Sequence, residues 1–125
     1  MKTALLFPGQ ASQYVGMGKD LYENHERARA LFDAANDIMG TDLRQICFEG
    51  PAEELKQTKY TQPAIFVHSV IMAELLGITP DAAAGHSLGE FSAYHAAGAL
   101  PLADALRLVR RRGELMYETG VQRPG

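Results

Sequence analysis

Two short apolar runs frame the hydrophobic pattern of the chain, and residues at helical spacing fill the long stretch between them. Thr3–Phe7 is a continuous apolar run that Pro8-Gly9 ends, which predicts a buried strand of a parallel sheet. Ala82–Gly85 fits a helix or a strand by periodicity alone. The glycines around Ser87 favour a strand that meets the N-terminus of a helix.

The remaining segments show the 3.6-residue spacing of apolar positions that predicts helices. The first long helix has Asn24 as its N-cap and Gly40 at its end. Thr41 or Asp42 caps a short helix that reaches Cys47. Further helical segments are expected at 51–55, from about Pro63 to Gly77, at 88–97 and at 101–117, with loops at 9–18 and 120–125. The order of strand, helices, strand, helices predicts an α/β fold.

Composition and charge narrow the class of function. The chain has 125 residues with a net charge of −3 and no large basic cluster, so we expect neither a nucleic-acid partner nor an anionic membrane partner. The longest apolar tract is interrupted by His68, Ser69 and Glu74, which argues against a transmembrane span. A single cysteine in an apolar run, Cys47, is expected to be a buried thiol, and the short apolar N-terminus is no signal peptide. These features predict a cytoplasmic protein.

The first candidate for chemistry is Ser87, which lies between two glycines in the stretch Gly85–Gly89. The pattern Gly-x-Ser-x-Gly is that of a nucleophile elbow, a tight strand-to-helix turn that exposes a serine hydroxyl. The helix that follows directs free N–H groups toward negative charge developing at such a turn. Taken by itself, the pattern is equally compatible with a glycine-rich turn that contains an incidental serine.

A nucleophilic serine needs a base, and none of the four histidines fits the role. His86 adjoins Ser87, but neighbours on a strand point to opposite sides, which makes His86 a structural residue. His95 lies about 12 Å further along a helix. His68 is on an apolar helix face and His25 is next to a helix start. We therefore expect the base to come from chain outside these residues, so that the chain is the N-terminal part of a longer enzyme; the alternative is a site without catalysis.

One arginine of the run Arg110–Arg112 falls within an apolar helical stripe. Arg112 follows Val109 by three residues and precedes Met116 by four, whereas the other two arginines lie further from the stripe. An arginine that faces a core needs a carboxylate partner. That partner is either a protein side chain, for example Glu90, or the carboxylate of a ligand gripped in bidentate fashion.

Four motifs in order resemble those of malonyl-CoA:acyl carrier protein transacylases and the related acyltransferase domains of fatty-acid and polyketide synthases. They are LFPGQASQ at 6–13, YTQPA at 60–64, GHSLGE at 85–90 and RRRGELM at 110–116. The resemblance covers the whole chain. It implies that residues 1–125 form the N-terminal part of an α/β-hydrolase-like parallel-sheet subdomain, incomplete as a domain, and that the ferredoxin-like small subdomain lies beyond them.

The resemblance also implies roles for individual residues. Ser87 is the nucleophile that takes the malonyl group as an ester, and Gln10 and the backbone N–H of Leu88 form the oxyanion hole. Arg112 holds the malonyl carboxylate, and Gln62 lies near the substrate pocket. The implied substrates are malonyl-CoA, as a CoA thioester, and acyl carrier protein, with no bound cofactor and no metal.

Two alternatives and one departure accompany the resemblance. A serine hydrolase of the esterase type would pass the acyl group to water, and a non-catalytic fragment would act as a binding or folding unit. Ala11 stands where the family usually has glycine, which affects the loop carrying Gln10 if that position needs a positive φ. Without the histidine, the segment alone is expected to be inactive.

Overall fold

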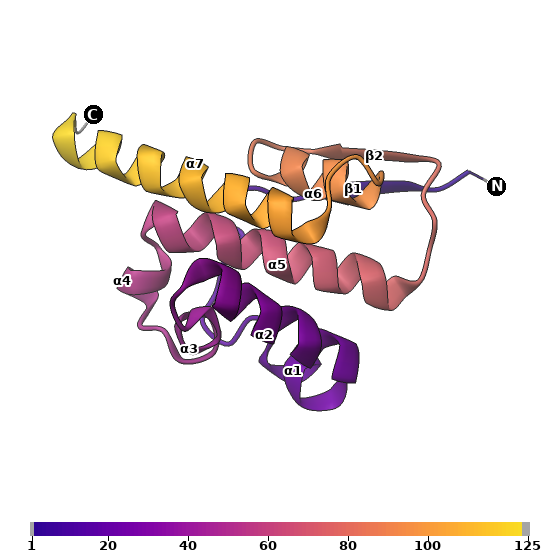
Figure 1. Cartoon of the computed structure of the whole chain (residues 1–125), viewed down its shortest axis with the longest axis horizontal. Coiled ribbons are helices and arrows are strands. Elements are labelled where there is room, and N and C mark those ends of the chain that lie inside the picture. The colour runs from indigo at the N-terminus through magenta and orange to yellow at the C-terminus, as the bar shows by residue number, and fades with distance from the viewer. Residues whose placement is uncertain (1, 124–125) are drawn as a thin grey trace.

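The fold is α/β, as the sequence predicts, in a computed structural model that describes residues 2–123. The elements within those residues follow one another as in Figure 1: β1 (Ala4–Phe7), α1 (Lys19–Asn24), α2 (Glu26–Met39), α3 (Leu43–Glu49), α4 (Ala52–Leu55), α5 (Thr58–Leu76), β2 (Ala82–Gly85), α6 (Gly89–Ala96) and α7 (Leu102–Gln122).

The two strands pair in parallel, with Ala4 opposite Ala82 and Phe7 opposite Gly85. This pairing confirms the strand at 82–85, for which periodicity alone left a helix open. The expectation of a buried first strand is wrong within the described residues, because Phe7 is buried but Leu6 is 80% exposed. Successive side chains alternate between the two faces of a strand, and α6 packs against both strands, so these two residues have different surroundings.

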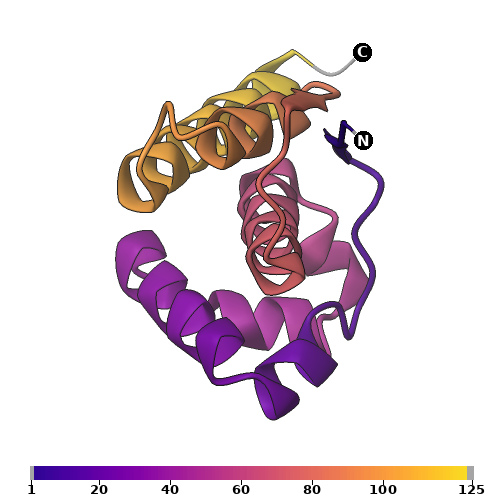
Figure 2. The same cartoon turned by 90° about the vertical axis from the view of Figure 1, so that its right-hand side faces the viewer.

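Helix α5 forms the centre of the structure. It lies between a layer of α6, α7 and the strands and a layer of α1, α2 and α3, as Figure 2 shows. Its residues 61–71 are buried apart from His68. The core of the protein gathers around them and includes the following large residues from the rest of the chain: Met17, Leu31, Phe32, Leu43, Ile46, Leu55, Leu88, Leu106 and Val109.

The prediction that this helix opens near Pro63 is wrong, since α5 begins at Thr58 and Pro63 lies inside it. Thr61 stabilises the added turn. Its hydroxyl donates to the carbonyl of Gln57 at 3.0 Å and also to that of Leu55, and its N–H donates to Gln57 at 2.8 Å. These bonds anchor the helix start before the proline. Pro63 is the sixth residue of α5, so its missing N–H removes the helical hydrogen bond to the carbonyl of Lys59.

Other helix boundaries differ from the sequence pattern in detail. Asn24 ends α1, a helix that the pattern does not reveal, and His25 takes the N-cap position of α2. Asp42 caps α3, because its carboxylate accepts from the N–H of Gln45 at 3.2 Å. Helix α7 extends to Gln122, past the predicted end at residue 117 and into the predicted tail loop, of which residues 124–125 lie outside the described part.

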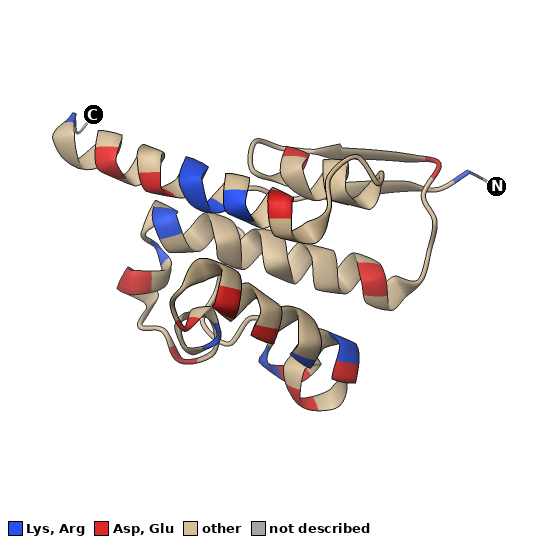
Figure 3. Cartoon of the chain, in the orientation of Figure 1, with Lys and Arg blue, Asp and Glu red and all other residues tan. Residues whose placement is uncertain are grey.

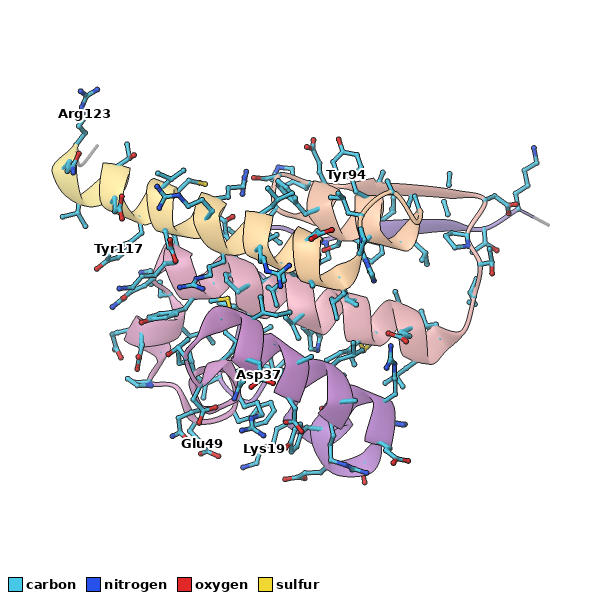
Figure 4. All side chains as sticks on the ribbon, viewed as in Figure 1. Lys19, Asp37, Glu49, Tyr94, Tyr117 and Arg123 are labelled. Carbon is cyan, nitrogen blue, oxygen red and sulfur yellow. The ribbon has the colours of Figure 1, made fainter. Side chains whose placement is uncertain are left out.

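Charged side chains spread over the outer helices, while the middle of α5 carries none, as Figure 3 shows. Figure 4 shows Tyr94 directed outward from α6 and Tyr117 on α7 near the beginning of α5, where the ammonium of Lys59 lies 4.5 Å from its ring centroid. Cys47 is a buried thiol, as predicted, and burial raises its pKa to about 12. Within residues 2–123 no helix is both long and apolar enough to span a membrane.

Candidate active site

Ser87 lies in the tight turn between the end of β2 and the start of α6. Its φ is 54°, in the left-handed region that residues other than glycine rarely adopt. The turn is closed by the N–H of Gly89, which donates to the carbonyl of His86 at 2.9 Å. It is tied to the neighbouring strand by the N–H of His86, which donates to the carbonyl of Phe7 at 3.1 Å. The Ser87 side chain is exposed at this turn.

The two glycines that flank Ser87 are required by packing. A Cβ on Gly85 would lie closer than 3.0 Å to the carbonyl carbon and oxygen of Gly89. A Cβ on Gly89 would lie equally close to the carbonyl of Phe7 on the adjacent strand. Backbone therefore meets backbone where α6 crosses the sheet, and this close approach fixes where the turn places Ser87.

Arg112 reaches Ser87 from α7. Its Nη2 donates to Ser87 Oγ at 3.1 Å, and its Nη1 donates to Oε1 of Gln62 at 2.6 Å. The guanidinium carbon also lies 5.6 Å from the ring centroid of Phe91, within the range of a cation–π contact. The ion pair with Glu90, one of the two partners left open by the sequence, does not form.

Arg112 is unlike its two neighbours in the arginine run. Arg110 and Arg111 both pair with Glu114, at 2.9 and 3.4 Å. The ion pairs formed among residues 2–123 do not include Arg112. The half-buried guanidinium is thus surrounded by a hydroxyl, an amide and an aromatic ring, and its positive charge remains available to an anion.

Gln62 is completely buried on α5, and it contacts Arg112. Its Nε2 donates to Sδ of Met116 at 3.0 Å. Both ends of the amide are therefore occupied, one by the arginine and one by the thioether. Gln62 thus contacts Arg112, which in turn contacts Ser87, while the prediction that Gln62 lies near a substrate pocket stays a prediction.

Gln10 lies in the loop after β1, and α5 holds its side chain. Its Nε2 donates to Oγ1 of Thr58 at 3.1 Å. The next residue, Ala11, has a φ of 85°, so the loop has a left-handed backbone at the position where the resemblance leads us to expect glycine. The N–H of Ala11 donates to Oε1 of Gln13 at 2.8 Å, which supports this conformation.

The loop start also contacts the turn at Ser87. Gly9 is buried against His86, since a Cβ on Gly9 would lie within 3.0 Å of the carbonyl oxygen of that histidine. Leu88 follows Ser87 as the N-cap of α6, and its side chain is fully buried. The predicted residues of both halves of the oxyanion hole thus belong to segments in contact.

The histidines in the described residues make no hydrogen bond to Ser87. His95 has its Nδ1 2.8 Å from the carbonyl of Leu100, within its own helix–loop connection. His68 is half-buried beneath the glycine-rich loop, and burial lowers its pKa. His86 is exposed and faces Gly9. That the base for Ser87 comes from further chain stays a prediction.

Residues 4–124 match the acyl transferase domain. The chain belongs to the acyl transferase domain family. Its similarity to malonyl CoA-acyl carrier protein transacylase of Bacillus subtilis strain 168 is 53% identity over 120 residues, which is 94% of this chain and 38% of that protein.

Solved structures of malonyl transacylases match the fold. The crystal structure of MCAT from Streptococcus pneumoniae has a TM-score of 0.90 at 46% identity, over 94% of this chain and 39% of that one. A malonyl-transacylase solved in complex with a type II PKS acyl-carrier protein has a TM-score of 0.89 at 41% identity, over 95% and 40%. The chain spans about two fifths of the length of the relatives it matches.

Three residues of the site in this acyl transferase domain were not singled out from the sequence: Thr58, Phe91 and Met116. For Phe91 a signal exists, because it lies in the first turn of the helix that follows Ser87. For Met116 the signal is its place four residues after Arg112 on the same apolar stripe of α7. Thr58 had no such signal, since its contact depends on how α5 packs against the loop of Gln10.

Proposed function

We propose that this chain supplies the nucleophile and the carboxylate-binding arginine of a malonyl-CoA:acyl carrier protein transacylase. The observation that carries the proposal is the 3.1 Å contact between Arg112 Nη2 and Ser87 Oγ, made by an arginine without a carboxylate partner among residues 2–123. A serine ester whose acyl group ends in a carboxylate fits this pair, because the acyl chain starts at Ser87 and its charge is drawn to the adjacent guanidinium.

Ser87 is the nucleophile in this proposal, and the turn that holds it is a nucleophile elbow. The positive φ of Ser87 and the close approach of Gly85 and Gly89 support that assignment. The Oγ attacks the thioester carbonyl of malonyl-CoA and loses its proton to a histidine base. The C–S bond breaks, CoA leaves as the thiol, and a malonyl ester remains on Ser87. The thiol of the acyl carrier protein then takes the acyl group by the reverse chemistry.

The negative oxygen of each tetrahedral intermediate is stabilised by the backbone N–H of Leu88 and by Gln10. Leu88 opens α6, so its N–H belongs to the helix end that favours negative charge. Because the side-chain amide of Gln10 is bonded to Thr58, the backbone N–H is the part of Gln10 that we assign to the oxyanion. Loss of one such donor typically costs about 10²–10³ in rate.

Arg112 selects the acyl group. A malonyl carboxylate pairs with its charge, whereas a neutral acetyl group leaves a half-buried cation without an anion. Gln62 belongs to the substrate-binding residues through its bond to this arginine.

The place of the chain in the enzyme is part of the same proposal. Residues 1–125 are the N-terminal segment of the large, hydrolase-like subdomain, and the base and the ferredoxin-like subdomain come from further chain of the kind that the relatives carry. The partners are malonyl-CoA and acyl carrier protein, as the names of the relatives support. The location is cytoplasmic, and the net charge of −3 supports a protein without nucleic-acid or membrane partners.

The test uses a hybrid enzyme in which residues 4–124 replace the matching segment of the Bacillus subtilis relative. Malonyl transfer to carrier protein, covalent label on Ser87 from malonyl-CoA, and hydrolysis are measured together. We expect transfer and label in the hybrid, loss of both in Ser87→Ala, and weaker malonyl transfer with poorer rejection of acetyl-CoA in Arg112→Ala. Release of malonate to water without transfer would support an esterase instead, and absence of any label would support a non-catalytic unit.

A further inference from the structure

We propose that Gln62 is a specificity-determining positioning residue, which with Phe91 holds the Arg112 guanidinium through uncharged contacts and so keeps its positive charge free for an acyl carboxylate. This inference rests on the proposed function and deepens it. The group that Arg112 recognises is an acyl chain that ends in a carboxylate. Gln62 acts through Arg112 and does not itself touch the substrate.

The first support is the buried amide of Gln62. Its side chain is 0% exposed, and its Oε1 accepts from Arg112 Nη1 at 2.6 Å. Its Nε2 donates to Sδ of Met116, a weak acceptor. The reverse orientation would set the NH₂ group against the guanidinium, with donor facing donor. The arginine therefore fixes the direction of the amide, and the amide in turn fixes the position of Nη1.

The second support is the aromatic ring of Phe91. It lies 5.6 Å from the guanidinium carbon of Arg112 and comes from α6, whereas Gln62 comes from α5. Two elements thus hold the same guanidinium from different sides. Neither contact neutralises the charge, because one is a carbonyl oxygen and the other a ring face.

The same helix shows what an acidic partner does. Arg110 and Arg111 share the carboxylate of Glu114 in ion pairs of 2.9 and 3.4 Å. An arginine paired in this way has a weaker attraction for a ligand anion, because that anion competes with a carboxylate already in place. A glutamate at position 62 would place such a competitor at the site of a 2.6 Å bond, since Gln and Glu have nearly the same shape.

The decisive variant is therefore Gln62→Glu, with Gln45→Glu as its matched control. Gln45 is exposed on α3, so the same change in charge occurs away from Arg112. The first measurement titrates the 125-residue chain with malonate and with acetate while NMR follows the Nε–Hε signal of Arg112. We expect malonate to shift this signal. Gln62→Glu should weaken malonate binding about 10- to 100-fold, because malonate then competes with a carboxylate for one charge-assisted hydrogen bond of the guanidinium.

The control should bind malonate as the wild type does, and thermal unfolding checks that each variant is folded. A wild-type signal that does not respond to malonate overturns the inference, as does a Gln62→Glu chain that binds malonate with unchanged affinity. Equal loss in both variants also overturns it, because the effect then follows net charge and not the position of residue 62.

The second measurement uses the hybrid enzyme and separates this inference from the proposed function. Gln62→Glu should raise the KM for malonyl-CoA more than it lowers kcat, and should leave acetyl transfer unreduced. If Ser87→Ala abolishes transfer but Gln62→Glu leaves malonyl selectivity unchanged, the role proposed for Gln62 is wrong and the proposed function is unaffected. If the hybrid still transfers malonyl groups after Ser87→Ala, the proposed function itself is wrong.

Discussion

Replacing Gly85 with alanine tests whether the close approach of α6 to β2 holds the turn at Ser87. The added Cβ would meet the carbonyl group of Gly89 with an overlap of more than about 1 Å relative to ordinary contact near 3.5 Å. Because the obstructing atoms are backbone, no side chain can rotate away, and α6 has to move from the sheet. Overpacking costs about 1–3 kcal/mol, and a backbone clash belongs at the upper end.

The net effect on stability follows from two terms of opposite sign. Alanine reduces the entropy of the unfolded chain and returns about 0.4–1 kcal/mol. A net loss of about 2 kcal/mol remains, which lowers the unfolding midpoint by roughly 8 °C for a chain of this length. Displacement of α6 also carries Ser87 away from Arg112, whose Nη2 is 3.1 Å from Oγ in the intact structure.

The assay is thermal and urea unfolding followed by helical circular dichroism, with Gly120→Ala as the matched control. Gly120 lies in α7, and a Cβ there would meet nothing within 4 Å. The same substitution should therefore stabilise the chain by about 0.5–1 kcal/mol at this exposed helical position. A Gly85→Ala chain as stable as the wild type, with an unchanged denaturant slope, would refute the packing argument.

Three further predictions concern the loop, the thiol and the acid response. Ala11→Gly should stabilise the chain by about 0.5–1 kcal/mol in urea unfolding, because a left-handed alanine costs about 1–2 kcal/mol and the added entropy of unfolded glycine offsets part of the gain; a lower midpoint would contradict this. Burial raises the pKa of Cys47 to about 12, so a disulfide reagent at pH 8 should label it only after unfolding, and immediate labelling of the native chain would argue against burial. Burial lowers the pKa of His68 below its ordinary 6.5, partly offset by Asp20, so protonation favours the unfolded chain. Stability should then fall as the pH drops below about 6.5, and His68→Gln should flatten the change in melting temperature between pH 7.5 and 5; parallel curves would exclude this histidine as the cause.

Local features of the fold were predictable from the sequence. The strand–turn–helix around Ser87 follows from glycine spacing and from the apolar run before it, and both signals lie within a few residues. Arg112 was distinguished from Arg110 and Arg111 by its place on an apolar stripe, and the structure separates the same residue from the other two. These predictions succeeded because they depend on one element at a time.

Contacts between elements were not predictable in the same way. The sequence left a protein carboxylate or a ligand as the partner of Arg112, and the structure supplies Gln62, from fifty positions earlier, together with Phe91. The start of α5 was missed because proline usually marks a first turn, whereas here the hydroxyl of Thr61 secures an earlier one. Both outcomes depend on side chains whose partners are set by packing.

The first turns of α5 contact two parts of the proposed site, the loop of Gln10 and the guanidinium of Arg112. Thr58 and Gln62 are four residues apart and so share a face; Thr58 holds the loop of Gln10, and Gln62 holds Arg112. Gly113, next to Arg112, permits this arrangement, because a Cβ there would lie 3.1 Å from the carbonyl of Thr58. The two residues of α5 that contact the Gln10 side chain and Arg112 are therefore spaced by one helical turn. A displacement of this helix start would disturb the Gln10 loop and Arg112 together, because adjacent turns of α5 carry the contacts to both.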